Sequence, residues 1–186
     1  SALRRAAELA PNAPAPWRAL AEQLTLLEDD ASADAAYAQS IRASVNDPNL
    51  MLAAHALCEG KLAIAERLLR AHLYQKPTDA AAIRMLAEVA ARLGRFDDSE
   101  KLLRRCLELA PSFRAARHNY ALVLHRQGKA EAAIGQIDLL LKEEPNNPSY
   151  RFLQASALAR VGEYQRAIEI YRSLLAAFPN NARGWL

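Results

Sequence analysis

Histidine is the side chain best suited to metal binding and to proton transfer near neutral pH. This chain has four histidines: His55, His72, His118 and His125. His118 and His125 are seven residues apart, so on a helix they share a face but lie two turns, about 10 Å, from each other. Ligands at that separation on one helix are poorly placed to share a metal ion. We therefore predict no metal site and expect the histidines to lie on solvated helix faces.

The two cysteines, Cys58 and Cys106, are far apart in the sequence. They form no CxxC pair and belong to no ladder of evenly spaced cysteines. Neither a disulfide framework nor a zinc site is predicted from such a pattern. We expect Cys106 to be a small residue of the core.

Sequence motifs of known catalytic sites are missing as well. The chain contains no GxSxG, HExxH, GxxxxGK[ST] or GxGxxG segment. Its acidic pairs, Asp97-Asp98 and Glu143-Glu144, fall at the expected ends of helices, where such charges are common. We therefore expect a non-catalytic chain that needs no cofactor.

The glycines and prolines that punctuate the chain recur with one fixed spacing. Each glycine stands 17 residues ahead of a proline, and the members of either series are 34 residues apart: Gly60, Gly94, Gly128 and Gly162, then Pro77, Pro111, Pro145 and Pro179. Glycine readily adopts the positive φ that ends a helix, and proline lacks the N–H that a continuing helix needs. This period predicts repeats of two antiparallel helices, and hence an all-α solenoid.

Small and large side chains recur inside each repeat. With the proline counted as position 32, positions 8 and 20 hold small residues: Ala53, Ala87, Ala121 and Ala155, then Ala65, Ser99, Ala133 and Ala167. Larger residues occupy positions 24 and 28: Leu69, Leu103, Ile137 and Tyr171, then Leu73, Leu107, Leu141 and Leu175. We expect the small residues where two helices cross closely and the large ones facing the core.

The combined pattern resembles the tetratricopeptide repeat family, which has glycine, alanine, an aromatic residue and proline at matching positions. The resemblance covers almost the whole chain and implies a right-handed superhelical solenoid of antiparallel helix pairs. It divides a single array, 1–186, into the tail of a preceding repeat (1–11), five repeats (12–47, 48–79, 80–113, 114–147 and 148–181) and the start of a next repeat (182–186).

The first repeat departs from this pattern. Glu28 stands where the turn glycine belongs, and Asp29 and Ser32 offer side-chain caps for the next helix instead. The spacing to the second repeat contracts by two residues around residues 46–51, so we expect a shortened first helix there. Both ends of the chain fall inside repeats and lack a polar capping face. We therefore expect a piece of a longer polypeptide that can self-associate through its ends.

In the tetratricopeptide family, certain positions of each first helix line an inner groove that binds peptides. Carried onto this sequence, the groove residues are Arg84, Met85, Glu88 and Arg92, then His118, Asn119, Leu122, His125 and Arg126, then Phe152, Leu153, Ser156 and Arg160. The strip is basic and apolar, which predicts an acidic peptide or protein partner. The clamp by which chaperone-binding members hold a terminal carboxylate is largely missing from it.

A further resemblance concerns residues 56–73, 84–95, 116–129 and 155–168. These segments are similar to the N-terminal repeats of bacterial proteins in which such repeats precede a sulfotransferase domain. The resemblance implies an alternative role, as a substrate-recruiting or dimerising arm of such an enzyme. None of that domain's phosphate-binding residues is present in this sequence.

Composition limits the classes of partner. A net charge of +3 is mild for a nucleic-acid-binding protein, so we predict no nucleic-acid partner. No run of about 18 uncharged apolar residues is present, so we expect a soluble, cytoplasmic protein. The sequence as a whole predicts a non-catalytic scaffold for protein–protein interaction.

Overall fold

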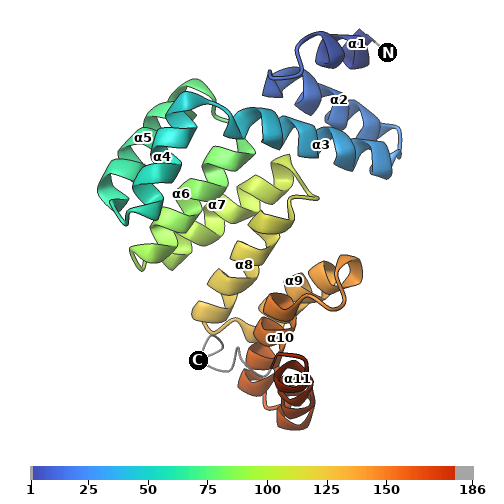
Figure 1. Cartoon of the computed structure of the whole chain (residues 1–186), viewed down its shortest axis with the longest axis vertical. Coiled ribbons are helices and arrows are strands. Elements are labelled where there is room, and N and C mark those ends of the chain that lie inside the picture. Colours follow the sequence, from blue (N-terminus) through green and yellow to red (C-terminus); the bar gives the residue numbers. More distant parts are fainter. Residues whose placement is uncertain (1, 179–186) are drawn as a thin grey trace. The chain divides into compact units, whose positions relative to one another are not determined.

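The computed structural model describes residues 2–178, so Pro179 and the partial repeat predicted at 182–186 lie outside the described residues. Helices and short turns make up this part of the chain, which contains no strand (Figure 1). The helices are α1 (Ala2–Leu9), α2 (Pro14–Leu26), α3 (Asp30–Val45), α4 (Pro48–Cys58), α5 (Leu62–Gln75), α6 (Ala80–Arg92), α7 (Phe96–Leu109), α8 (Arg114–Arg126), α9 (Ala130–Glu143), α10 (Pro148–Arg160) and α11 (Tyr164–Ala177). The predicted all-α fold of paired helices is confirmed.

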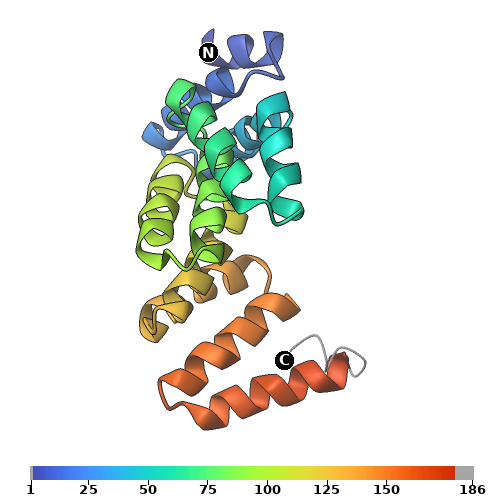
Figure 2. The ribbon, with the colours of Figure 1, turned by 90° about the vertical axis from the view of Figure 1, so that its left-hand side faces the viewer.

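The chain divides into two compact units, residues 1–116 and residues 117–186. In the first unit α2 packs on α3, α4 on α5 and α6 on α7. The second unit holds most of α8, and in it α10 packs on both α9 and α11. Figure 2 shows that α10 and α11, drawn in orange and red, run antiparallel. Each unit has a core of its own.

The turn inside each repeat has the geometry that the glycine spacing predicts. Gly60, Gly94, Gly128 and Gly162 have φ between 73° and 88°. The residue after each glycine donates its N–H to a carbonyl five residues earlier, as in Lys61 to Ala56 at 2.9 Å. This is the bond that closes a helix C-terminus in the Schellman motif.

The first repeat makes the same turn without glycine. Glu28 has a φ of 59°, and Asp29 donates its N–H to the Leu24 carbonyl at 3.1 Å. Asp29 also caps α3, because its carboxylate accepts a hydrogen bond from the Ser32 N–H at 3.2 Å. The repeat therefore keeps the backbone path and places an L-residue in the left-handed region.

The core follows the predicted pattern of small and large residues. All four alanines at position 8 are fully buried, and Ser99 donates a hydrogen bond from its Oγ to the Ala87 carbonyl at 2.7 Å. Cys106 is also fully buried, as predicted. Leu175 differs from the prediction: it is 47% exposed on α11, the last helix of the described residues.

The two-residue contraction lies where the first and second repeats meet. Helix α4 has 11 residues, whereas α6 and α10 have 13. Helix α3 has 16 residues and packs against both α4 and α6. The first repeat therefore contacts α6 directly, in addition to the helix that follows it.

His72 corrects the expectation that the histidines lie on solvated faces. Its side chain is buried, and its Nε2 lies 2.8 Å from Asp79 Oδ2 in a hydrogen bond. Asp47 lies on the other side, with Oδ1 3.8 Å from Nδ1. Both carboxylates come from turns that precede helices, and the 34-residue period gives no sign that they converge on a buried ring.

Candidate functional site

In the first unit, the predicted groove residues on α6 form a row of charges. Arg84 Nη1 lies 3.3 Å from Glu88 Oε2, and Arg92 Nη2 lies 2.7 Å from Glu88 Oε1. Arg92 also donates a hydrogen bond from Nη1 to the Leu57 carbonyl at 3.0 Å. One carboxylate thus lies between two guanidinium groups and offsets much of their positive charge.

Two neighbouring side chains of α6 serve packing. Met85 is only 5% exposed and belongs to the core around Leu50 and Leu69, so its predicted role as an apolar anchor for a ligand is not compatible with this position. The guanidinium carbon of Arg84 lies 6.0 Å from the centre of the Phe113 ring, a cation–π contact. The α6 row therefore offers a partner few unused groups.

In the second unit, side chains of α8 meet those of α10. His125 Nε2 lies 3.0 Å from Ser156 Oγ in a hydrogen bond. The rings of His118 and Tyr150 lie 5.3 Å apart, tilted by 54°. Burial lowers the pKa of both histidines. These contacts bring both imidazoles of α8 against side chains of α10.

Two arginines lie close to His125 without a carboxylate to offset them. Besides burial, the positive charges of Arg160 and Arg126 lower the pKa of the imidazole. Both arginines are exposed, and neither forms an ion pair within the described residues. We call the set Arg126, Arg160, His125 and Ser156 the basic patch.

The other predicted groove residues of the second unit have different surroundings. Phe152 packs edge-on against Tyr171, with ring centres 5.5 Å apart, and Leu122 is 36% exposed. Asn119 is half-buried on α8. Leu153 is buried in the core beside Ile137, so its predicted place in the groove is wrong. Leu122 and Phe152 remain as apolar groups on the same helices as the basic patch.

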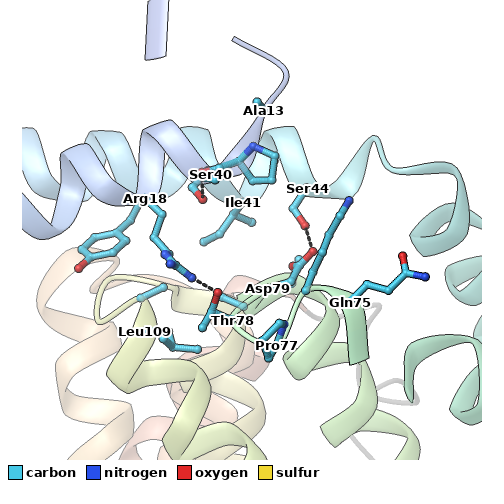
Figure 3. A pocket seen from close by; sticks show the side chains of 17 residues that line it. Ala13, Arg18, Ser40, Ile41, Ser44, Gln75, Pro77, Thr78, Asp79 and Leu109 are labelled. Carbon is cyan, nitrogen blue, oxygen red and sulfur yellow. Dashed lines mark hydrogen bonds between the residues drawn. The ribbon is translucent and has the colours of Figure 1, made fainter. Parts of the chain in front are cut away.

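A cavity of about 310 Å³ in the first unit was not predicted from the sequence. It lies among α2, α3, the turn before α6 and the end of α7, and Arg18 is among its lining residues (Figure 3). The walls come from residues as far apart as Ala13 and Ala110. The contraction between repeats was a signal that packing changes at this place, but spacing alone cannot show a cavity.

Neither a metal-binding cluster nor a membrane-spanning helix is found among residues 2–178. No group of three or more histidine, cysteine, aspartate or glutamate side chains in this range is placed to hold a metal ion. Within the same range, no helix combines the length and the apolar character needed to cross a membrane.

Several solved structures are similar to this chain at low sequence identity. YrrB, described as a tetratricopeptide repeat protein with an unusual peptide-binding site, is 17% identical, with a TM-score of 0.64 over 97% of this chain and 94% of that one. MamA (41-end) from Desulfovibrio magneticus RS-1 is 17% identical, with a TM-score of 0.65 over 70% of this chain and 74% of that one. A chain of the APC/C hetero-tetramer Cut9–Hcn1 is also 17% identical, with a TM-score of 0.68 over 97% of this chain and 36% of that one.

At such identities the likeness is one of fold. Comparison with curated proteins gives no match. The family model described as tetratricopeptide repeat matches residues 50–112, 84–148 and 121–182. These overlapping matches extend over most of the sequence, so the chain belongs to the tetratricopeptide repeat family.

Proposed function

We propose that this chain is a non-catalytic scaffold that binds an acidic segment of a partner protein, with its main contact at the basic patch of the second unit. The observation that carries the proposal is that Arg126 and Arg160 lie near one imidazole and that, among residues 2–178, no carboxylate is paired to either. Membership of a family of helical-repeat proteins, whose stacked helices form extended binding surfaces, supports it.

The chemistry of the basic patch suits a carboxylate. A guanidinium group donates paired N–H bonds to a carboxylate, and a charge-assisted hydrogen bond is about twice as strong as a neutral one. His125 and Ser156 already share a hydrogen bond, which restricts the imidazole. Leu122 and Phe152 would supply apolar contacts for side chains beside the acidic residue. The partner would therefore combine Asp or Glu with apolar neighbours.

The α6 row is a weaker candidate for the same partner. Glu88 already bridges Arg84 and Arg92, so an incoming carboxylate would have to compete with it. Exposed ion pairs contribute little, about 0 to 1 kcal/mol, but Glu88 would also repel a second carboxylate. We therefore leave the α6 row out of the proposed contact.

The proposal can be tested with a short fluorescein-labelled peptide that contains glutamate, leucine and phenylalanine. Its binding to the 186-residue chain is followed by fluorescence anisotropy at low and moderate salt. We expect Arg126→Ala combined with Arg160→Ala to weaken binding by about tenfold or more, because both positive charges of the basic patch are removed. A peptide with glutamine in place of each glutamate should bind the unchanged chain more weakly.

Arg172→Ala is the matched control, because Arg172 is an exposed arginine of the same unit on α11. It changes the net charge without touching the basic patch and should leave binding within about twofold of the unchanged chain. Equal losses in the control and in the double variant would reduce the effect to net charge and remove the basic patch from the proposal. Unchanged binding in the double variant would do the same.

The resemblance to the repeats of sulfotransferase-fused bacterial proteins stays a prediction, and so does a cytoplasmic location. An immunoblot against this 20.5 kDa chain would measure the mass of the native polypeptide. A mass larger by about 30 kDa or more leaves room for a catalytic domain of ordinary size. In that case the basic patch would recruit an acidic substrate protein to the attached enzyme.

A further inference from the structure

The cavity of the first unit lies at the defect in the repeat pattern. The preceding repeat ends in Val45 instead of proline, and α3 packs against α6 as well as α4. The side chains there are small, which leaves the space between the helices unfilled: Ala13, Pro14, Ala15, Pro77, Ala80, Ala81 and Ala110 all line the cavity. A volume of about 310 Å³ is at the small end of the range for small-molecule sites.

Hydrogen bonds hold the walls of the cavity together. Ser40 Oγ on α3 donates to the Pro14 carbonyl of α2 at 2.9 Å. Ser44 Oγ, also on α3, donates to Asp79 Oδ2 in the turn before α6 (Figure 3). Arg18 Nη1 on α2 donates to Thr78 Oγ1 in the same turn. Because three elements are tied to one another, the cavity is formed before any ligand arrives.

Arg18 brings an unsatisfied charged donor to this space. Its Nε is buried and has no hydrogen-bond partner. Glu22 Oε1 lies 3.2 Å from Nε, yet the N–H does not point at it, since no hydrogen bond forms. Nε has almost no exposed surface, so a ligand in the cavity would reach the guanidinium group through its Nη atoms. Nη1 donates to Thr78, and Nη2 makes no hydrogen bond within the described residues, so a carboxylate could accept a charge-assisted bond from it.

Asp79 is the acidic residue of the cavity wall, and its oxygens are already used. Oδ2 accepts from Ser44 and His72, and Oδ1 accepts from the Ala82 N–H at 3.1 Å. In Figure 3 Asp79 lies beside Ser44, and Arg18 lies toward the opposite end beyond Thr78. An anion at the Arg18 end is therefore separated from this carboxylate.

The remaining lining decides what the anion must carry. Ile41 and Leu109 line the cavity together with the alanines and prolines, so most of the surface is hydrocarbon. Phosphate or sulfate would leave that surface uncovered and would lose hydration on all sides. A carboxylate on a short aliphatic body satisfies the guanidinium and fills the apolar part.

We propose that this cavity is a binding site for an aliphatic carboxylate, with Arg18 receiving the carboxylate and the small apolar side chains receiving the hydrocarbon. The same chemistry occurs in a free medium-chain acid and in the C-terminal leucine of a peptide. The inference is independent of the basic patch, because it concerns the other unit of the chain.

The test is isothermal titration calorimetry of the 186-residue chain with four probes. Octanoate is compared with octanamide, and a short peptide ending in Leu-Leu with a free carboxylate is compared with its C-terminal amide. We expect the acid of at least one pair to bind about tenfold or more tightly than its amide. The pair that shows this preference identifies the source of the carboxylate.

Variants locate the effect. Arg18→Gln should abolish the preference for acid over amide, whereas Arg42→Gln, an exposed arginine on α3 outside the lining, should keep it. Ala15→Trp, at an exposed lining position, should block both acid and amide. Circular dichroism at 222 nm shows whether each variant is folded. If the Arg18→Gln variant does not fold, Ala15→Trp provides the test.

Three results would overturn the proposal. They are binding of neither acid, equal binding of acid and amide, and an acid preference that persists in Arg18→Gln. An Ala15→Trp variant that is folded and binds the acid as before would place the ligand outside the cavity and would count against it as well.

Discussion

Glu28 is the one non-glycine residue with positive φ within residues 2–178, and replacing it with glycine should stabilise the first unit. An L-residue in the left-handed region costs about 1 to 2 kcal/mol. Glycine removes that cost but adds about 0.5 to 1 kcal/mol of backbone entropy to the unfolded chain. Glu28 is exposed and makes no ion pair within the described residues, so nothing else is lost. The expected net gain from Glu28→Gly is about 0.5 to 1 kcal/mol.

Replacing a turn glycine with an L-residue should lower the free energy of unfolding. Gly94 has a φ of 75°, and an added Cβ would meet nothing within 4 Å, so Gly94→Ala adds backbone strain without a clash. Alanine also lowers the backbone entropy of the unfolded chain, so we expect a net loss of about 0.5 to 1 kcal/mol.

Urea unfolding followed by circular dichroism measures the free energy of unfolding of each variant, and thermal unfolding should shift by about 2 to 4 °C for each kcal/mol. Glu28→Ala is the control, because it removes the carboxylate and keeps the strain, so it should give little gain. A Glu28→Gly variant no more stable than Glu28→Ala would refute the reasoning, since the positive φ would then carry no cost.

Three other predictions concern buried or partly buried groups. Asp79→Ala should lower the free energy of unfolding by about 2 to 4 kcal/mol, because it removes the cap of α6 and the acceptor of two buried donors; urea unfolding measures this, and a loss below about 1 kcal/mol would contradict it. Iodoacetamide at pH 8 should label exposed Cys58 in the folded chain and spare Cys106, because burial raises the pKa of the Cys106 thiol to about 12. Mass spectrometry of the peptides measures the labelling, and labelled Cys106 in the folded chain would contradict the prediction. The pKa values of His118 and His125 are lowered in the folded state, so the unfolded state binds protons more readily below the ordinary value of 6.5, and stability should fall as the pH falls from 7 toward 5. Urea unfolding across that range checks the sign, and replacing both with glutamine should flatten the dependence.

Most of the helices could be predicted because glycine or proline, each with a backbone constraint, follows their ends. The glycine period fixes the left-handed turns, and the alanines mark where helices cross, so local chemistry alone determines the pairs. Even the turn at Glu28 was visible, because Asp29 follows with a capping side chain.

The site could be predicted only in part, because it depends on contacts between repeats. The family pattern placed His125 and Ser156 on the same surface, and they do share a hydrogen bond. It could not show that Glu88 offsets two arginines or that Met85 is buried against α4 residues such as Leu50. Those outcomes follow from how α4 and α6 pack after the contraction.

The central claim is that a partner's carboxylate binds at the basic patch, and the protonation of His125 reports on it directly. In the free chain, burial and the positive charges of Arg160 and Arg126 hold the pKa of this imidazole below its ordinary value. A bound carboxylate would offset those charges, so a histidine NMR titration with saturating acidic peptide should show the pKa of His125 rising. A peptide that binds by anisotropy and leaves the pKa of His125 unchanged would contradict the account.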